Sequence, residues 1–239
     1  MQTSKHGLVV SAHSADFVWR AGGAIALYAQ RGWTMTVVCL SFGERGESAK
    51  LWRQPGMTLE RVKQDRRAEA ERAAEVLGAQ IRFLDLGDYP LRVSDEALFQ
   101  LADIYRELRP AFVLTHSQRD PYNFDHPLAT HVAQEARIIA QAHGPAPGEP
   151  VLGAPPVFLF EPHQPEQCEW KPQVLLDITE VWDKKRQAFE LMAAQEHLWE
   201  YYTRVALQRG VQASRNSDAK IRYAEAYQRV FPQVTGELA

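Results

Sequence analysis

Five short apolar runs recur along the chain, and longer helical patterns separate them. The runs are rich in Val, Leu and Phe, have the length of strands, and occupy residues 6–12, 35–42, 81–87, 111–116 and 156–162. The helical patterns occupy residues 17–31, 59–77, 94–108 and 126–143. Continuous apolar runs are typical of strands buried on both faces of a sheet. The alternation therefore predicts right-handed βαβ units and a mostly parallel sheet flanked by helices.

Turn-forming residues agree with the ends of these predicted helices. Gly32 and Gly78 follow helical runs, where a C-terminal cap is expected. Arg109-Pro110 ends the helix before the fourth strand, because the residue before a proline disfavours helical backbone.

The last third of the chain is more helical. Residues 174–179 have the pattern of one more strand, and residues 180–210 form a long amphipathic stretch that predicts a C-terminal helical segment. The Pro/Gly-rich stretch 144–156 is typical of a surface loop rather than a domain boundary. We therefore expect a single α/β domain over residues 1–239, with a Rossmann-like sheet.

Composition narrows the class of function. A formal net charge of -3 argues against nucleic acid as a partner, because phosphate backbones need a concentrated basic face. Cys39 and Cys168 are not clustered, and the N-terminal residues have no basic segment followed by an apolar one. No run reaches the roughly 18 apolar residues of a membrane span. We expect a cytoplasmic protein that acts on a small molecule, with no membrane partner.

Polar residues follow every predicted strand. They are His13 and Asp16, Gly43 to Ser48, Asp88, His116 to His126, and Glu161 with His163. Ligands of open α/β sheets bind outside the carboxyl ends of the strands, so these segments are where a site is expected.

Three of these residues have the chemistry of a metal site. His13 and Asp16 are three apart across a strand-to-helix turn, and His126 follows another strand end. A His-Asp-His set suits Zn²⁺ with one position left for water or substrate. Helix capping and simple solvent exposure remain alternatives for such a pair.

Several segments together resemble one known family. SAHSADFVWRAGGAIAL (11–27) resembles the AHPDDE-containing first turn of the PIG-L (LmbE-like) zinc deacetylase superfamily. FGERGES resembles its loop after the second strand, RRAEAERAAEVLGAQIRFLDLGDYPL its next helix and strand, RPAFVLTH its fourth strand, and NFDH its HPDH motif. The resemblance extends over nearly the whole chain, to YAEAY near residue 223.

The resemblance implies a zinc ion bound by His13, Asp16 and His126, with Asp125 beside them. A metal-binding histidine usually has a partner on its other nitrogen, which Asp125 or a backbone carbonyl can provide.

Two departures from the family pattern affect the expected reaction. The first acid of the PDD triplet, the general base of the deacetylases, is here Ala15, and a methyl group cannot take a proton. The first histidine of HPDH, which resembles an oxyanion stabiliser, is here Asn123, which donates a hydrogen bond but is no general acid near neutral pH. Losing a positioned base typically costs about 10²- to 10⁴-fold in rate.

Glu47 and His163 are candidates for a different proton chemistry. Both follow strand ends, and a carboxylate and an imidazole on opposite sides of a substrate can deliver water to one carbon and a proton to its neighbour. By composition, Glu44 is as good a candidate as Glu47. The simpler interpretation of either acid is a solvated loop residue, and the simpler interpretation of His163 is a loop histidine that is hydrogen-bonded to the backbone.

The AHSAD variant is similar to the hydratases of the superfamily, which act in the 4,5-cleavage of gallate and protocatechuate. That resemblance implies the addition of water to a conjugated polycarboxylic dienol or its keto form, with zinc as a Lewis acid at the enol or keto oxygen. Guanidinium groups should bind the substrate carboxylates, and the candidates near strand ends are Arg20, Arg45, Arg53 and Arg119.

The segment GESAKLWRQPGMTLERV is expected to be a lid or a subunit contact, and with the aromatic stretch 198–205 it favours a homo-oligomer. Two other functions stay open. One is an N-deacetylase of the PIG-L type with a relocated base, and the other is a non-catalytic protein that binds a polycarboxylate.

Overall fold

In the computed structural model, which describes residues 5–236, the chain builds one seven-stranded sheet of order β3-β2-β1-β4-β5-β7-β6. The strands are β1 (His6–Ser11), β2 (Thr34–Cys39), β3 (Ala79–Phe83), β4 (Phe112–Thr115), β5 (Val157–Phe160), β6 (Val174–Asp177) and β7 (Ala224–Arg229). Strands β1 to β5 pair in parallel, whereas β7 is antiparallel to both β5 and β6. The prediction of a mostly parallel α/β sheet is confirmed.

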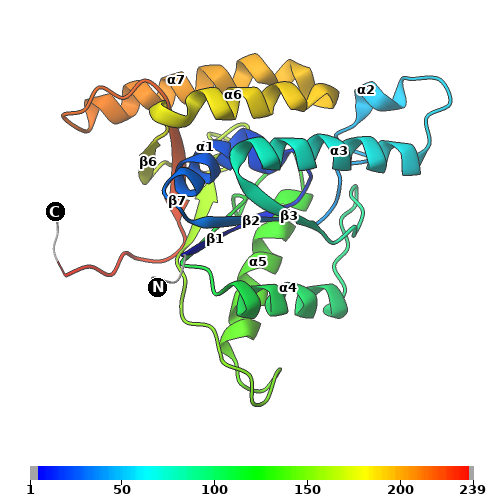
Figure 1. Ribbon diagram of the computed structural model, residues 1–239, viewed down its shortest axis with the longest axis vertical. Coiled ribbons are helices and arrows are strands. Elements are labelled where there is room, and N and C mark those ends of the chain that lie inside the picture. Colours follow the sequence, from blue (N-terminus) through cyan, green and yellow to red (C-terminus); the bar gives the residue numbers. More distant parts are fainter. Residues whose placement is uncertain (1–4, 237–239) are drawn as a thin grey trace.

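Helices cover both faces of the sheet (Figure 1). One face carries α1 (Asp16–Gln30), α3 (Leu59–Leu77), α6 (Trp182–Leu191) and α7 (Trp199–Arg215), and the other carries α4 (Asp95–Leu108) and α5 (Asp125–Gln141). The short helix α2 (Ala49–Trp52) precedes α3, and two 3-10 helices, η1 (Thr179–Val181) and η2 (Ala193–Leu198), flank α6.

The hydrophobic core lies in two layers, one on each side of the sheet. In β1, Val9 packs with the α1 and α3 side, while Leu8 and Val10 pack with the α4 and α5 side. Successive side chains of a strand point to opposite faces, so a continuous apolar run supplies both layers. None of the helices in residues 5–236 has the length and apolar character needed to span a bilayer.

The structure corrects two predictions and adds a strand that was not predicted. The helix expected over residues 180–210 is broken into α6, η2 and α7, and Gln195 within the break has the non-helical φ of -125°. Strand β3 lies at the edge of the sheet and is only partly buried, not buried on both faces. Strand β7 was not predicted, because the polar residues of AEAYQR hide its strand pattern.

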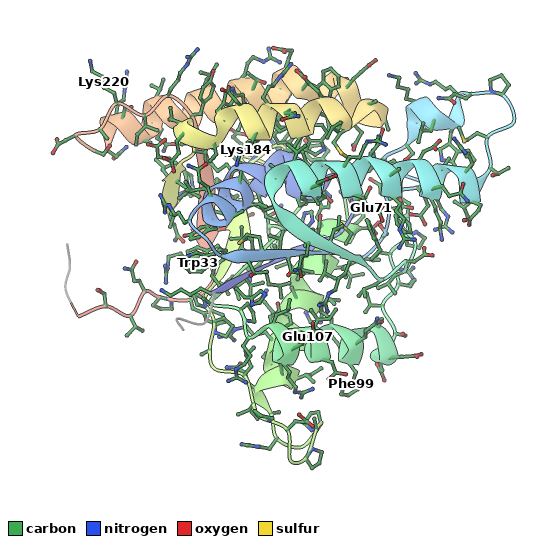
Figure 2. The ribbon with its side chains drawn as sticks, viewed as in Figure 1. Trp33, Glu71, Phe99, Glu107, Lys184 and Lys220 are labelled. Carbon is green, nitrogen blue, oxygen red and sulfur yellow. The ribbon has the colours of Figure 1, made fainter. Side chains whose placement is uncertain are left out.

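Strand β7 holds the helix that carries part of the candidate site. The buried carboxylate of Glu225 accepts hydrogen bonds from the backbone N–H groups of Gly23 and Ala24 within α1, at 2.7 and 2.8 Å. It also accepts from Lys185 Nζ at 2.5 Å and from the Tyr227 hydroxyl at 2.6 Å. The preceding residue of α6 differs: Lys184, labelled in Figure 2, is exposed to solvent, whereas Lys185 is buried. These bonds join β7 and α6 to the middle of α1.

Candidate metal centre and active-site cleft

The candidate site lies where the direction of chain winding reverses. From β1 the chain proceeds outward through β2 to β3, and then returns to β4 on the other side of β1. His13 and Asp16 follow β1, and His126 lies in the first turn of α5, after β4. The crevice outside adjacent strands at such a switch point is the usual ligand site of open α/β sheets.

Four side chains converge there and are called the metal cluster below, because they could hold one metal ion. They are His13, Asp16, Glu47 and His126, each with one potential ligand atom within 4.8 Å of the others. His13 Nδ1 is 3.1 Å from Asp16 Oδ2 and 3.2 Å from Glu47 Oε1. His126 Nε2 is 3.5 Å from Asp16 Oδ1 and 3.9 Å from Glu47 Oε1. Ligand atoms bound tetrahedrally at the usual zinc distances stand about 3.3 Å apart, so this spacing fits one small cation.

Each imidazole of this cluster has a carboxylate at its other nitrogen. Asp125 Oδ2 is 3.3 Å from His13 Nε2, and Asp120 Oδ2 is 2.8 Å from His126 Nδ1. His126 Nε2 is buried and has no hydrogen-bond partner within residues 5–236. With Nδ1–H donating to Asp120, the lone pair on Nε2 points at the cluster, which is the state of a metal-binding histidine. The donor set and the unpartnered nitrogen therefore fit a bound metal ion.

Negative charge dominates the cluster. Burial by itself lowers the pKa of His13, but Glu47, Asp125 and Asp16 outweigh burial and raise that pKa well above its ordinary value. Burial raises the pKa of Asp16, yet His126, His116 and His13 bring it well below its usual range. An imidazole enclosed by three carboxylates is the surrounding expected where a cation compensates the charge.

The loop after β2 presents Glu47. Gly43 has a φ of +69°, and a Cβ there would lie 3.2 Å from His13 Cβ and 3.3 Å from Glu47 Cβ, so the loop passes close to both side chains. The buried carboxylate of Asp88 accepts from the backbone N–H groups of Arg45 and Gly46 at 2.8 and 2.7 Å. Asp88 thus fixes the turn that directs Glu47 at the metal cluster.

The structure separates the two acids that composition left equal. Glu44 is fully buried, accepts from the Phe42 N–H at 3.2 Å, and lies outside the cluster. Burial raises the pKa of Glu44, and the charge of Asp88 adds to that rise. Glu47 lies in the cluster, and its pKa is lowered because His13 outweighs the effect of burial. Glu47 is the ionised carboxylate beside His13.

Asn123 and His163, the other two predicted catalytic residues, have different surroundings. Asn123 Nδ2 donates to Glu47 Oε1 at 3.4 Å, and Asn123 Oδ1 accepts from the Asp125 N–H at 3.1 Å. The ring of His163 stacks on Tyr201 with centroids 4.1 Å apart, and within residues 5–236 it has no hydrogen-bond partner. Burial, followed by the charge of Arg20, lowers the pKa of His163. The structure joins Asn123 to the cluster. It places His163 against the rings of Tyr201 and Tyr202, outside the four residues of the cluster.

The four predicted substrate arginines also differ. Arg20 is buried, its Nε lies 3.7 Å from Asp16 Oδ1, and neither Nε nor Nη1 has a hydrogen-bond partner in the described chain. Arg45 Nη1 donates to the Asp88 carbonyl at 2.9 Å, and Arg119 pairs with Glu169 at the surface. Arg53 is exposed and lines a cleft beside Glu47.

This open cleft has a volume of about 740 Å³. Glu47 belongs both to the cleft and to the metal cluster, so it connects the cluster with solvent. The ring of Tyr89 forms part of the cleft wall and lies 6.2 Å from the ring of His13, centroid to centroid. The remaining lining residues are Gly46, Ala49, Lys50, Arg53, Ala194, Gln195, Glu196 and His197. A cleft of this volume is large enough for a small-molecule ligand.

Sequence reasoning missed several residues of the site. Asp120 lies six positions before His126, and an acid so close to a strand end was a usable signal. His116 stacks on His126 at 4.3 Å, and its Nε2 accepts from the Ala12 N–H at 2.9 Å. Gln195 and His197 come from the break between α6 and α7, which a continuous helical pattern conceals.

Known proteins with the same fold fall into two groups. A 4-oxalmesaconate hydratase of Pseudomonas putida KT2440 is 68% identical over 98% of this chain and 93% of its own length. The crystal structure of GalB, the 4-carboxy-2-hydroxymuconate hydratase from Pseudomonas putida KT2440, matches with a TM-score of 0.97 at 68% identity, over 98% of this chain and 100% of that one. N,N'-diacetylchitobiose deacetylase from Pyrococcus horikoshii shares the fold, with a TM-score of 0.79 at 23% identity over 96% and 85% of the two chains.

The model of the PIG-L family, described as GlcNAc-PI de-N-acetylase, matches residues 8–137. This segment is more than half of the chain, and it contains His13, Asp16, Glu47 and His126. The chain therefore belongs to the PIG-L family.

Proposed function

We propose that this protein is a metal-dependent hydro-lyase that adds water to 4-oxalomesaconate, or to its dienol form 4-carboxy-2-hydroxymuconate, to give 4-carboxy-4-hydroxy-2-oxoadipate. The observation that carries the proposal is the 68% identity to a hydratase over 98% of the chain. The coverage of 98% matters, because it leaves few residues unmatched, whereas the cluster and the cleft draw residues from positions 13 to 197.

In this proposal His13, Asp16 and His126 hold Zn²⁺. Two imidazole nitrogens and a carboxylate are a common ligand set of catalytic zinc, and Asp125 and Asp120 orient the two imidazoles. When bound, the ion supplies a Lewis acid that stabilises negative charge on the enol or keto oxygen of the substrate.

Glu47 acts as the base in this proposal. Its carboxylate is ionised, faces both the cluster and the cleft, and can take a proton from the water that attacks the substrate. Asn123 Nδ2 donates to Glu47 Oε1 and so limits the directions in which the carboxylate can turn.

His163 handles the second proton. Hydration forms a carbon–oxygen bond at one carbon of the double bond and a carbon–hydrogen bond at its neighbour, so one proton leaves water and one reaches carbon. To deliver this proton, the His163 imidazole must first take one up, and Glu47 returns the proton that it took from water to solvent after each turnover. Burial lowers the pKa of His163, so its imidazolium form is a strong acid that releases the proton readily, and its ring has no competing hydrogen bond in the described chain. In the reverse assignment, neutral His163 takes the proton from water, and Glu47 protonates carbon after it has taken up a proton from solvent.

Deacetylation is disfavoured by Ala15. Its side chain is fully buried and packs in the α1 side of the hydrophobic core, so nothing at this position can activate water.

We propose further that the enzyme acts in the cytoplasm, in the 4,5-cleavage of gallate and protocatechuate, and as a homo-oligomer. The aromatic side chains of Tyr122 and Phe124, 59% and 83% exposed, support an association between copies.

An absorbance assay tests the proposed function. Hydration interrupts the conjugation of the dienol, so its near-ultraviolet band should decay with zinc-restored protein and persist with metal-free protein. Acetate release from an N-acetylated sugar is measured in parallel. Acetate release without loss of the dienol band would support a deacetylase, and tight binding of the dienol without turnover would support a binding protein.

A further inference from the structure

The break between α6 and α7 is held in place by buried ionic contacts. The guanidinium of Arg66 on α3 is fully buried, and its Nη2 donates to Gln195 Oε1 at 2.9 Å while its Nη1 donates to Glu69 Oε2 at 2.7 Å. Glu69 Oε1 accepts from the Ala194 N–H at 2.9 Å. A buried arginine is costly unless its donors are used, so these bonds indicate that the position of η2 is specifically maintained.

The break places His197 in the wall of the cleft that contains Glu47. A continuous helix would turn residues 193–198 through regular steps and would not need the contacts from Arg66 and Glu69. Lys50 also fixes this segment, since its Nζ donates to the Ala193 carbonyl at 3.2 Å and lies 2.8 Å from Glu196 Oε2. The break between α6 and α7 therefore places the exposed side chain of His197 in the cleft wall.

Three side-chain donors of the cleft are unused. Within residues 5–236, neither the Arg53 guanidinium nor the His197 ring nor the Tyr89 hydroxyl has a hydrogen-bond or ion-pair partner. The positive charge of Lys50 is compensated by Glu196, which leaves Arg53 as an uncompensated cation in the lining. Unused donors that share one cleft are suited to an anionic ligand with several oxygen atoms.

The metal cluster cannot bind every carboxylate of such a ligand. Asp16, Glu47 and Asp125 all lie within 3.3 Å of the His13 ring nitrogens and repel further anions. A carboxylate that does not contact the metal therefore needs a cation or a hydrogen-bond donor elsewhere in the cleft, and Arg53 and His197 both line that cleft.

We infer that Arg53 and His197 form a carboxylate subsite, separate from the metal cluster, that selects tricarboxylate over dicarboxylate ligands. The inference rests on the proposed hydratase function for its natural ligand. It gives His197 a role in binding and specificity, and it leaves the proton transfers to Glu47 and His163.

Two inert acids test the subsite. Tricarballylate carries three carboxylates and glutarate two, and neither can be hydrated. Binding of each to the zinc-loaded protein is measured by calorimetry, and KM and kcat for the dienol are measured on the same samples. Arg53→Ala and His197→Ala should each weaken tricarballylate binding about tenfold, the usual effect of losing one charge-assisted hydrogen bond, and should leave glutarate binding nearly unchanged. KM should rise by a similar factor with kcat changed less than about threefold.

Matched variants exclude general effects. Arg215→Ala, at the far end of α7, and His131→Ala, exposed on α5, remove the same side chains outside the cleft and should bind tricarballylate as the unmodified protein does. Arg53→Lys and His197→Gln keep a donor and should recover part of the affinity.

The outcomes are distinct. Equal tricarballylate affinity in the cleft variants and the unmodified protein overturns the subsite, and so does an unmodified protein that binds both acids equally. A large fall in kcat for His197→Ala at constant KM also overturns it, because His197 would then take part in the reaction. If the dienol is not hydrated but the tricarballylate effects hold, the proposed function fails and the subsite stands.

Discussion

Asp120 and His126 are joined by a contact of 2.8 Å between a carboxylate oxygen and Nδ1 of the imidazole, and Nε2 of the same ring faces the metal cluster. This contact selects one tautomer of His126. Asp120 is therefore placed to influence a metal ion bound by His126 without touching it.

Asp120→Asn should therefore weaken metal binding by about 10- to 100-fold. The amide can present its own N–H to Nδ1, which favours the wrong tautomer, and it removes a negative charge that makes His126 a better ligand. Affinity is measured by competition with a chromogenic chelator. His13→Ala should lose the metal altogether, whereas an Asp120→Asn protein of unchanged affinity would show that the contact does not act on the metal.

Glu47→Gln separates catalysis from metal binding. The amide keeps the size of the side chain but cannot accept a proton, so turnover of the dienol should fall about a hundredfold or more while the zinc content stays near one per chain. Glu44→Gln on the same loop is the control and should keep most of the activity, because Glu44 lies outside the cluster. Zinc lost from Glu47→Gln would instead identify Glu47 as a required ligand.

Lys185→Met should destabilise the fold by about 3–5 kcal/mol, because it leaves the buried carboxylate of Glu225 without its cation. The midpoint of urea unfolding measures the effect. Lys184→Met is the control on the exposed side of α6 and should change stability by less than about 0.5 kcal/mol. The double variant Lys185→Met/Glu225→Gln should recover part of the lost stability. Equal urea midpoints of Lys185→Met and Lys184→Met would contradict the prediction.

Gly210→Ala should destabilise the fold by about 1–3 kcal/mol through overpacking. A Cβ at this position of α7 would overlap the backbone carbonyl of Arg222, which cannot move away as a flexible side chain can. Gly144→Ala, where a Cβ meets nothing within 4 Å, is the matched control. The midpoints of denaturant unfolding are compared between Gly210→Ala and Gly144→Ala. Similar midpoints would show that a Cβ at position 210 does not overlap its neighbours.

Stability should fall in alkaline solution. Burial raises the pKa of the Cys168 thiol to about 11, and it also raises the pKa values of Cys39 and Tyr105. The unfolded thiol titrates near 8.5, so the stabilisation is complete below about pH 8.5 and is lost as the pH rises toward 11. Urea midpoints measured across this range should fall less steeply for Cys168→Ala than for the unmodified protein. Parallel curves would show that Cys168 does not contribute.

Local patterns were sufficient to predict most of the fold. Helix α3 spans the predicted residues 59–77, and it ends at Gly78 with a φ of +79°. The convergence of His13, Asp16 and His126 also followed from sequence, because the ends of neighbouring parallel strands meet at one edge.

What sequence could not supply depends on contacts between distant segments. The break at Gln195 depends on Arg66, 129 positions away, and no local pattern encodes that contact. The four candidate arginines could not be ranked, because a long side chain can direct its guanidinium far from its own backbone position. Arg45 and Arg119 bond to neighbours, while Arg53 reaches the cleft.

Strand β7 enters the sheet between β5 and β6, although it comes after both in the chain. Its Glu225 reaches across to the amides of Gly23 and Ala24, about two hundred residues earlier. During synthesis, the helix that begins with Asp16 must therefore wait for nearly the whole polypeptide to emerge before its final support is present. Premature termination before residue 224 would leave a gap inside the sheet, and a shortened product would be a substrate for proteases rather than a slower enzyme.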